Sequence, residues 1–230
     1  MGFNPGVLDF VTECSQEFGL PGHSAILDVG TSELFCADDA QSLNRFLVFF
    51  GAQPYPETEL ARMANRGFAA DLLIRAGFHY TAIDFADLPH TTRLDLNYDD
   101  LPAEHYERYD FVLNSGTSEH ILNQYNVFKV MHQATQVGGL MYHGVPMAGE
   151  FEHGIFTYNP KFFWALAEAN EYQLLRIWGW ASSESHALAE SMQAEIPFNN
   201  RLMAHDAYLH VLLRRTSGRA FRGLVDPAFK

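Results

Sequence analysis

The sequence predicts an α/β protein whose central sheet is covered by helices on both faces. Segments typical of strands alternate with segments of helical periodicity along most of the chain. Each strand-like segment is almost continuously apolar, as expected when both faces of a strand are buried. The last two strand segments are not separated by a standard crossover helix, so we expect an antiparallel edge.

Seven segments have the apolar and aromatic composition of buried strands. They are SAILDVG (24–30), FHYTAIDF (78–85), TTRLDLN (91–97), YDFVLNS (109–115), GGLMYHGVP (138–146), YQLLRIWGW (172–180) and AYLHVLLRR (207–215). A polar stretch at 181–205 precedes the last strand and is expected to be a variable insertion.

Helical patterns fill much of the remaining chain. They cover the first 20 residues up to GLPG, then 37–53, 57–77, 119–136 and 159–170. Asp38 or Asp39 can cap the second helix, and Pro54 stops it. Thr117 or Ser118 can cap the fourth. The segment 57–77 is expected to form one continuous helix.

Charge and composition exclude several kinds of partner. The formal net charge is −13 and no run is rich in Lys and Arg, which disfavours nucleic acids and acidic membrane surfaces. A neutral, aromatic or basic small molecule, or a peptide, fits this surface better. No secretory signal is evident, and no stretch approaches the ~20 apolar residues needed to span a bilayer. We therefore expect a cytoplasmic protein in which Cys14 and Cys36 are free thiols, although a single disulfide stays open.

Polar residues end four of the expected strands, at the sheet edge where ligands bind in such folds. They are Asp28 with Gly30, Asp84, Asp95, and Asn114 with Ser115. Each of them alone is more often a cap or a turn former. Their recurrence indicates a nucleoside-containing cofactor: the acid after the second strand can accept both hydroxyls of a ribose, and a glycine after the first lets the backbone approach.

These segments also resemble a known family. ILDVGTSE, YTAIDF, TRLDLN, YDFVLNSGTSEHILN and VGGLMYHGVP follow one another as the motifs of class I S-adenosylmethionine-dependent methyltransferases do. The segment HGIFTYNPKFFWALAEANEYQLL resembles a subgroup of uncharacterised bacterial small-molecule methyltransferases. The resemblance implies a Rossmann-like three-layer sandwich over residues 1–230 as a single domain, with a seven-stranded, mostly parallel sheet and an antiparallel last strand.

The same resemblance implies a site for S-adenosyl-L-methionine. The first motif lies beside the methionine part, Asp84 at the ribose, and Asp95 with Leu96 on the adenine side. The full expected cofactor-binding set is Asp28, Gly30, Thr31, Asp84, Phe85, Asp95, Leu96, Asn114, Ser115 and Glu119.

Two departures from the family pattern matter. Ser32 and Leu34 stand where the first motif usually has its second and third glycines. Asp28 and Asp84 are 56 residues apart, so a helical insertion at 36–57 is expected after the first strand, as a lid or as a dimer contact. A homodimer is therefore open, and so is a non-catalytic role as a cofactor-binding or partner subunit. An NAD(P)-dependent oxidoreductase is a weaker alternative, because GTSELF does not match G-x-G-x-x-G.

Three histidines are candidates for the base that a hydroxyl acceptor would need, which favours O-methylation. His153 leads because of its loop position; His143 lies at the end of the fifth strand, and His120 follows the fourth. For His143 a packing role is equally open, and each of the three could simply be hydrogen-bonded.

No required metal is predicted. Glu119–His120 and Glu152–His153 are two acid–imidazole pairs, and some ubiquinone-biosynthetic O-methyltransferases carry E-x-x-E-H at the first of these places. Gly116 stands where the first Glu of that pattern should be, so the triad is incomplete.

Overall fold

The computed structural model describes residues 2–149, 152–181, 184–187 and 207–226. The chain divides into two compact units, Met1–Leu94 and Asp95–Lys230. Of the predicted insertion at 181–205, residues 182–183 and 188–205 lie outside the described residues. Among the helices that are described, none is long and apolar enough to cross a membrane.

The first unit contributes three parallel strands: β2 (Ala25–Val29), β5 (His79–Asp84) and β6 (Thr91–Arg93). β5 pairs with β2 on one side and β6 on the other. Since all three run in one direction, their carboxyl ends reach the same edge. The segments that follow β2 and β5 therefore start from neighbouring points.

A second, smaller sheet in this unit was not predicted. β1 (Gly2–Phe3) lies parallel to β3 (Glu33–Phe35), and β4 (Asn65–Phe68) lies antiparallel to β3. The prediction of one continuous helix over 57–77 is wrong for this reason. That segment forms α3 (Glu57–Ala64), then β4, then α4 (Ala69–Arg75).

Arg66 of β4 explains the break. Arg66 has a left-handed φ of 65°, which ends a right-handed helix. Its guanidinium also forms an ion pair with Glu33 of β3, with Nη2 and Oε2 2.7 Å apart. Strand pairing and this contact outweigh the helical pattern of the side chains.

The remaining helices of the first unit match the predicted pattern. They are α1 (Pro5–Phe18), the 3₁₀ turn η1 (Ala37–Asp39) and α2 (Gln41–Phe49). Asn4 caps α1 by accepting a hydrogen bond from the N–H of Val7, and Gly19 ends it in a left-handed conformation with φ 73°. Both η1 and α2 fall within the segment predicted as a helical insertion.

The second unit holds a mixed sheet. In spatial order it consists of β10 (Glu184–Ala187), β9 (Tyr172–Ala181), β11 (Ala207–Arg215), β8 (Thr135–Ala148) and β7 (Tyr109–Ser115). β7 and β8 are parallel, and the last strand β11 is antiparallel to both of its neighbours, as predicted. β10 adds a short hairpin partner to β9 that the sequence did not predict.

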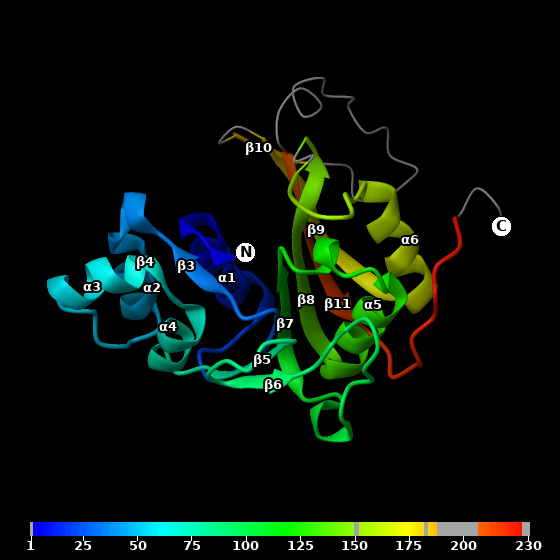
Figure 1. Cartoon of the computed structure of the whole chain (residues 1–230), viewed down its shortest axis with the longest axis horizontal. Coiled ribbons are helices and arrows are strands. Elements are labelled where there is room, and N and C mark those ends of the chain that lie inside the picture. The colour runs from blue at the N-terminus through cyan, green and yellow to red at the C-terminus, as the bar shows by residue number, and fades with distance from the viewer. Residues whose placement is uncertain (1, 150–151, 182–183, 188–206, 227–230) are drawn as a thin grey trace. The chain divides into compact units, whose positions relative to one another are not determined.

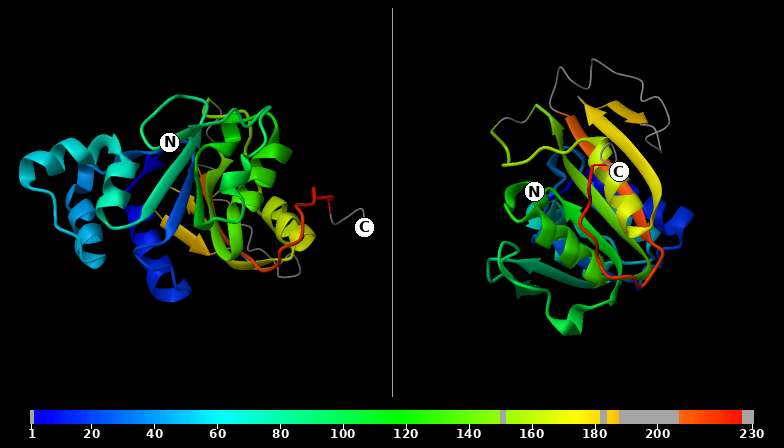
Figure 2. Two further views of the ribbon diagram at one scale, coloured as in Figure 1. Left: turned by 90° about the horizontal axis from the view of Figure 1, so that it is seen from below. Right: turned by 90° about the vertical axis from the view of Figure 1, so that its right-hand side faces the viewer.

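Helices α5 (Gln124–Ala134) and α6 (Pro160–Asn170) pack on one face of this sheet (Figures 1 and 2). Phe128 of α5 lies 4.9 Å from Phe162 and 6.3 Å from Phe163 of α6, measured between ring centroids. These aromatic contacts join the two helices over β8. A further 3₁₀ turn, η2, spans Ala103–His105.

The helix predicted over 119–136 begins later than expected. A 3₁₀ turn, η3 (Ser118–His120), follows β7, and the α-helix starts at Gln124. The predicted cap at Thr117 or Ser118 is wrong, because Asn123 caps α5 by accepting a hydrogen bond from the N–H of Asn126. The acid–imidazole pair therefore belongs to the loop between β7 and α5.

Candidate functional site

In the first unit, Asp84 ends β5 and organises the loop that follows β2. Its Oδ2 accepts a hydrogen bond from the N–H of Thr31 at 2.9 Å, and its Oδ1 accepts one from Ala86 at 3.0 Å. Gly30 has a φ of 89° and donates its N–H to the carbonyl of Ile83. The carboxylate is half-buried and retains lone pairs beyond these two bonds.

Asp28 lies deeper under the same loop. It is fully buried, and its Oδ2 accepts hydrogen bonds from the hydroxyl of Tyr80 at 2.8 Å and the N–H of Ser32 at 3.1 Å. Its Oδ1 has no hydrogen-bond partner among the described residues. Burial raises the pKa of this carboxyl to about 7, against the lowering effect of these hydrogen bonds. Asp28 therefore helps to hold the loop after β2 through its hydrogen bond from Ser32.

Phe85, the next residue after Asp84, is 73% exposed. A large aromatic ring in water is uncommon next to a buried strand and is available to stack on a ligand. The loop after β2 and the end of β5 thus bring together Asp28, Gly30, Thr31, Asp84 and Phe85, all within the first unit.

In the second unit, Asp95 and Leu96 belong to a turn that supports the loop after β7. Asp95 accepts hydrogen bonds from the N–H and the side-chain amide of Asn97. Asn97 in turn accepts the N–H groups of Leu122 and Asn123. Leu96 is buried, and its carbonyl accepts a hydrogen bond from the side-chain amide of Asn126.

Asn114, at the end of β7, links the loop after β7 to β8 through its side-chain amide. Its Oδ1 accepts the N–H groups of Thr117 and Ser118 at 3.2 and 3.1 Å. Its Nδ2 donates to the hydroxyl of Ser118 and lies 3.3 Å from Nδ1 of His143. All of its hydrogen-bonding capacity is used inside the protein. Ser115, its neighbour, is also buried.

His143 lies in β8 among aromatic rings and is 1% exposed. Its ring centroid is 5.5 Å from that of Phe128 and 5.0 Å from that of Phe163. Burial lowers the pKa of this imidazole to about 3. A neutral, enclosed imidazole is a poor general base, which favours the packing role over the catalytic one.

We expect His143 to stay neutral down to pH 5, with its proton on Nε2 because Nδ1 accepts from Asn114. Imidazole ¹⁵N chemical shifts in NMR spectra recorded from pH 7.5 to pH 5 check this, with the signal assigned by its loss in His143→Gln. A titration midpoint near the ordinary value of about 6.5 would contradict it.

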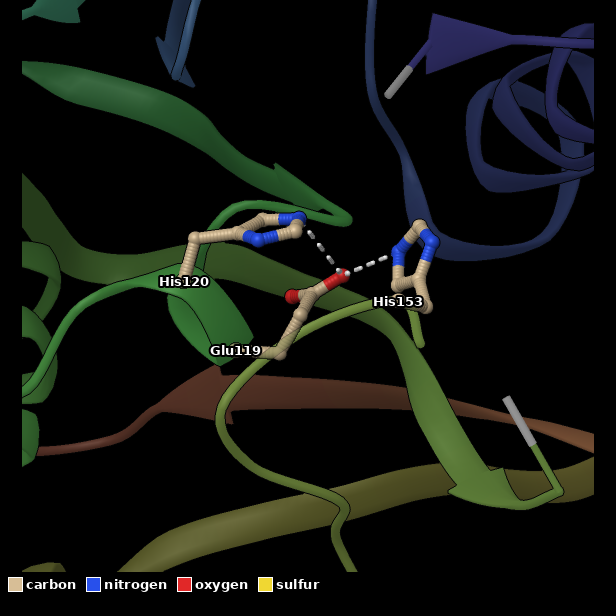
Figure 3. Close-up of side chains that lie close together, drawn as sticks. All are labelled: Glu119, His120 and His153. Carbon is tan, nitrogen blue, oxygen red and sulfur yellow. Dashed lines mark hydrogen bonds and ion pairs between the residues drawn. The ribbon is translucent and has the colours of Figure 1, made fainter. Parts of the chain in front are cut away.

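Figure 3 shows Glu119 between the imidazoles of His120 and His153. Oε1 of Glu119 is 3.3 Å from Nε2 of His153 and 3.9 Å from Nε2 of His120. Glu119 is fully buried, whereas the side chains of His120 and His153 are 40% and 30% exposed. Burial raises the pKa of Glu119, opposed by His153, and burial also lowers the pKa of His120. A buried acid thus meets two solvent-accessible imidazoles.

The loop that carries His153 is fixed onto the backbone of Glu119. The carbonyl of Glu119 accepts the N–H groups of Ile155 and Phe156 at 2.8 and 3.1 Å. At Gly154 an added Cβ would lie 2.8 Å from Cγ of Glu119, so only glycine fits there without a shift. Backbone and side-chain contacts together define this position of the histidine.

The meeting of Glu119 with His153 was not predicted. Both residues follow strands, β7 and β8, that are parallel neighbours, so both loops start from the same edge. The parallel pairing of β7 and β8 was therefore the observation from which this contact could have been predicted. Glu152, the other acid considered, is exposed and does not belong to the cluster.

Comparisons with known proteins bear on the fold. The chain matches no protein-family model and none of the curated proteins. Among solved structures it is similar to the 1,6-didemethyltoxoflavin-N1-methyltransferase of Burkholderia thailandensis, solved with 1,6-didemethyltoxoflavin and S-adenosylhomocysteine. The TM-score is 0.51 at 12% identity, over 93% of this chain and 80% of that one.

Two further structures are similar to the same extent. One, from Galdieria sulphuraria, is proposed to be a sarcosine dimethylglycine methyltransferase, with TM-score 0.53 and 13% identity over 92% of this chain and 85% of the other. The second is the [4+2]-cyclase SpnF, with TM-score 0.52 and 11% identity over 93% and 81%. At these identities the likeness concerns the fold, and the predicted Rossmann-like fold is confirmed.

Proposed function

Since the chain has the fold of class I methyltransferases, we propose that it is an S-adenosyl-L-methionine-dependent methyltransferase acting on a small molecule. One observation carries the proposal: in this fold, Asp84 ends β5 while holding the glycine-containing loop after β2. That edge is where ligands bind in open α/β sheets. A cytoplasmic location and a homodimer remain predictions beside this proposal.

Within this proposal the ribose hydroxyls bind Asp84, whose carboxylate still has lone pairs to accept them. Gly30 and Thr31 line the approach to the methionine part, and Phe85 offers an exposed ring. Asp95, Leu96 and Ser115 stay in the proposed cofactor set. Asp28 and Asn114 serve it indirectly, because their hydrogen bonds hold the two loops in place.

We propose oxygen as the acceptor atom, with a histidine as base. The acceptor oxygen would attack the methyl carbon of S-adenosyl-L-methionine in line with its carbon–sulfur bond. Cleavage of that bond would leave S-adenosylhomocysteine. The hydroxyl proton passes to the imidazole. His153 and His120 suit this role better than His143, because their rings are accessible to a substrate.

Titration calorimetry with S-adenosylhomocysteine tests the cofactor assignment. We expect saturable binding by the wild type and a loss of about tenfold or more in Asp84→Asn, which keeps the size but removes the charge that accepts two hydroxyls. Asp87→Ala is the matched control, since Asp87 is an exposed acid in the same segment. No binding by the wild type, or equal binding by Asp84→Asn and wild type, would rule out the assignment.

A second candidate is a cofactor-binding or partner subunit without methyl transfer. It is favoured by the loop after β2, where the N–H groups of Thr31 and Ser32 are already taken by Asp84 and Asp28. Two backbone donors that could face a ligand are thereby used internally. Binding of S-adenosylhomocysteine with no turnover across a panel of hydroxylated acceptors would favour this candidate.

A further inference from the structure

We propose that Glu119, His120 and His153 form a binding site for a divalent transition-metal ion. The site goes beyond the proposed methyl transfer, and binding of the cofactor does not depend on it. In the metal-bound protein His120 and His153 are ligands, so the ion rather than these imidazoles would promote deprotonation of the acceptor. It departs from the sequence-based expectation of no required metal, which rested on Gly116 standing in place of an acid. In the structure the third ligand comes instead from His153, 34 residues after Glu119 in the chain.

The geometry of the three side chains suits one ion. Their ligand atoms all lie within 4.8 Å of one another, and Oε1 of Glu119 is nearest to both imidazole nitrogens (Figure 3). Bonds of about 2.0–2.1 Å to a central ion place neighbouring ligand atoms about 3–3.5 Å apart. The distance of 3.3 Å to His153 already meets this value, whereas the His120 ring has to move toward both other ligands, since it is 3.9 Å from Oε1 and the set spans up to 4.8 Å.

The buried carboxylate supplies a second, independent observation. Glu119 is fully buried, yet no lysine or arginine of the described residues lies within ion-pair distance of it. Its Oε2 has no hydrogen-bond partner among those residues. Burying a carboxylate oxygen without a partner is costly, and a bound cation would offset that cost.

The surrounding structure holds the ligands in place, as metal sites require. The two N–H groups of Ile155 and Phe156 fix the backbone carbonyl of Glu119, and Gly154 lets the loop approach its side chain. On the other side, Gln124 donates its side-chain amide to the carbonyls of Ser118 and Ile121, which flank the Glu119–His120 pair. Both loops are therefore anchored before any ion arrives.

The donor set selects the kind of ion. Two imidazole nitrogens and one carboxylate oxygen suit zinc, iron or cobalt in the divalent state, whereas magnesium and calcium prefer oxygen ligands alone. Three protein ligands would leave coordination positions open, and the partial exposure of His120 and His153 makes the cluster accessible from solvent. Such an ion can bind an oxygen of a substrate and promote its deprotonation.

Metal binding by the full chain tests the proposal without any activity assay. Protein freed of metal with a chelator and then dialysed is titrated with Zn²⁺ by calorimetry and with Co²⁺ by visible absorption. We expect one equivalent to bind, with cobalt d–d bands characteristic of mixed nitrogen and oxygen ligands, and Mg²⁺ to bind much more weakly. His120→Gln and His153→Gln should each weaken Zn²⁺ binding at least tenfold, and Glu119→Gln as well.

His23→Gln is the matched control, because His23 is an exposed histidine outside the cluster. It should bind Zn²⁺ as the wild type does. Folding of each variant is checked by circular dichroism, and His120→Gln is the safest of them because His120 is the most exposed ligand. Absence of stoichiometric Zn²⁺ binding, or equal affinity in wild type, His120→Gln and His153→Gln, overturns the proposal. Neither result concerns the binding of S-adenosylhomocysteine, so the metal-site proposal and the cofactor assignment can be contradicted separately.

Discussion

Asn114→Ala is expected to lower the free energy of unfolding by roughly 3–5 kcal/mol. The substitution removes the acceptor of two buried backbone N–H groups, at Thr117 and Ser118, and the donor to Ser118 and His143. Each buried group left without a partner costs about 1–3 kcal/mol. Against a typical domain stability of about 5–15 kcal/mol, this loss is large.

Urea unfolding at pH 7.5, followed by circular dichroism, measures the effect. Asn159→Ala is the matched control, because Asn159 is an exposed asparagine of the same unit that only caps α6, through the N–H of Phe162. The control should lose about 1 kcal/mol. If Asn114→Ala loses no more stability than Asn159→Ala, the hydrogen bonds of Asn114 do not stabilise the loop after β7.

Asp28→Asn is expected to change how stability depends on pH. The pKa of Asp28 is raised by burial to about 7 in the folded protein, above its ordinary value of 3.8. For an acid shifted upward, the folded state holds its proton more tightly, so this contribution to stability is fully present only below the ordinary pKa of 3.8 and is lost progressively as the pH rises to 7. The wild type should thus lose about 2–3 kcal/mol between pH 5 and pH 8 through this group.

The asparagine cannot ionise, so its variant should lack this loss. Its oxygen can still accept from Tyr80 and Ser32, while its unpaired amide N–H groups cost about 1–2 kcal/mol at every pH. Thermal unfolding at pH 5, 6.5 and 8 should therefore show the variant at its weakest, relative to wild type, at pH 5. Asp71→Asn, an exposed site in the same unit, controls for net charge. A difference between Asp28→Asn and wild type that stays constant with pH would contradict the prediction.

The strands were predictable because a strand buried on both faces leaves a continuous apolar run in the sequence. All seven predicted segments contain strands of the structure, and the last is antiparallel to its neighbours. The break between α3 and α4 was not predictable from periodicity. The residues around Arg66 fit a helix by pattern, and their strand conformation depends on pairing with β3, a partner that lies 30 residues away.

The site was predictable in part for the same reason. The positions of Asp28, Asp84 and Asn114 near strand ends were predictable from the apolar runs that contain them, and their role at a ligand-binding edge stays a prediction. Their partners were not found, since the bond from Thr31 to Asp84 and that from Asn114 to His143 depend on strand register. The late start of α5 was missed because Asn123 competes with Thr117 and Ser118 as a cap, and local sequence does not rank them.

Because residues 153–156 are hydrogen-bonded to the carbonyl of Glu119, the stability of this segment and the position of Glu119 depend on each other. A ligand that stabilises this segment is therefore expected to stabilise Glu119, and a ligand of Glu119 is expected to stabilise the segment. Such effects are reciprocal: the factor by which one ligand raises the affinity for another equals the factor in the opposite direction. A ligand recognised by the segment and a ligand recognised by Glu119 are therefore expected to bind cooperatively, without any change elsewhere in the fold.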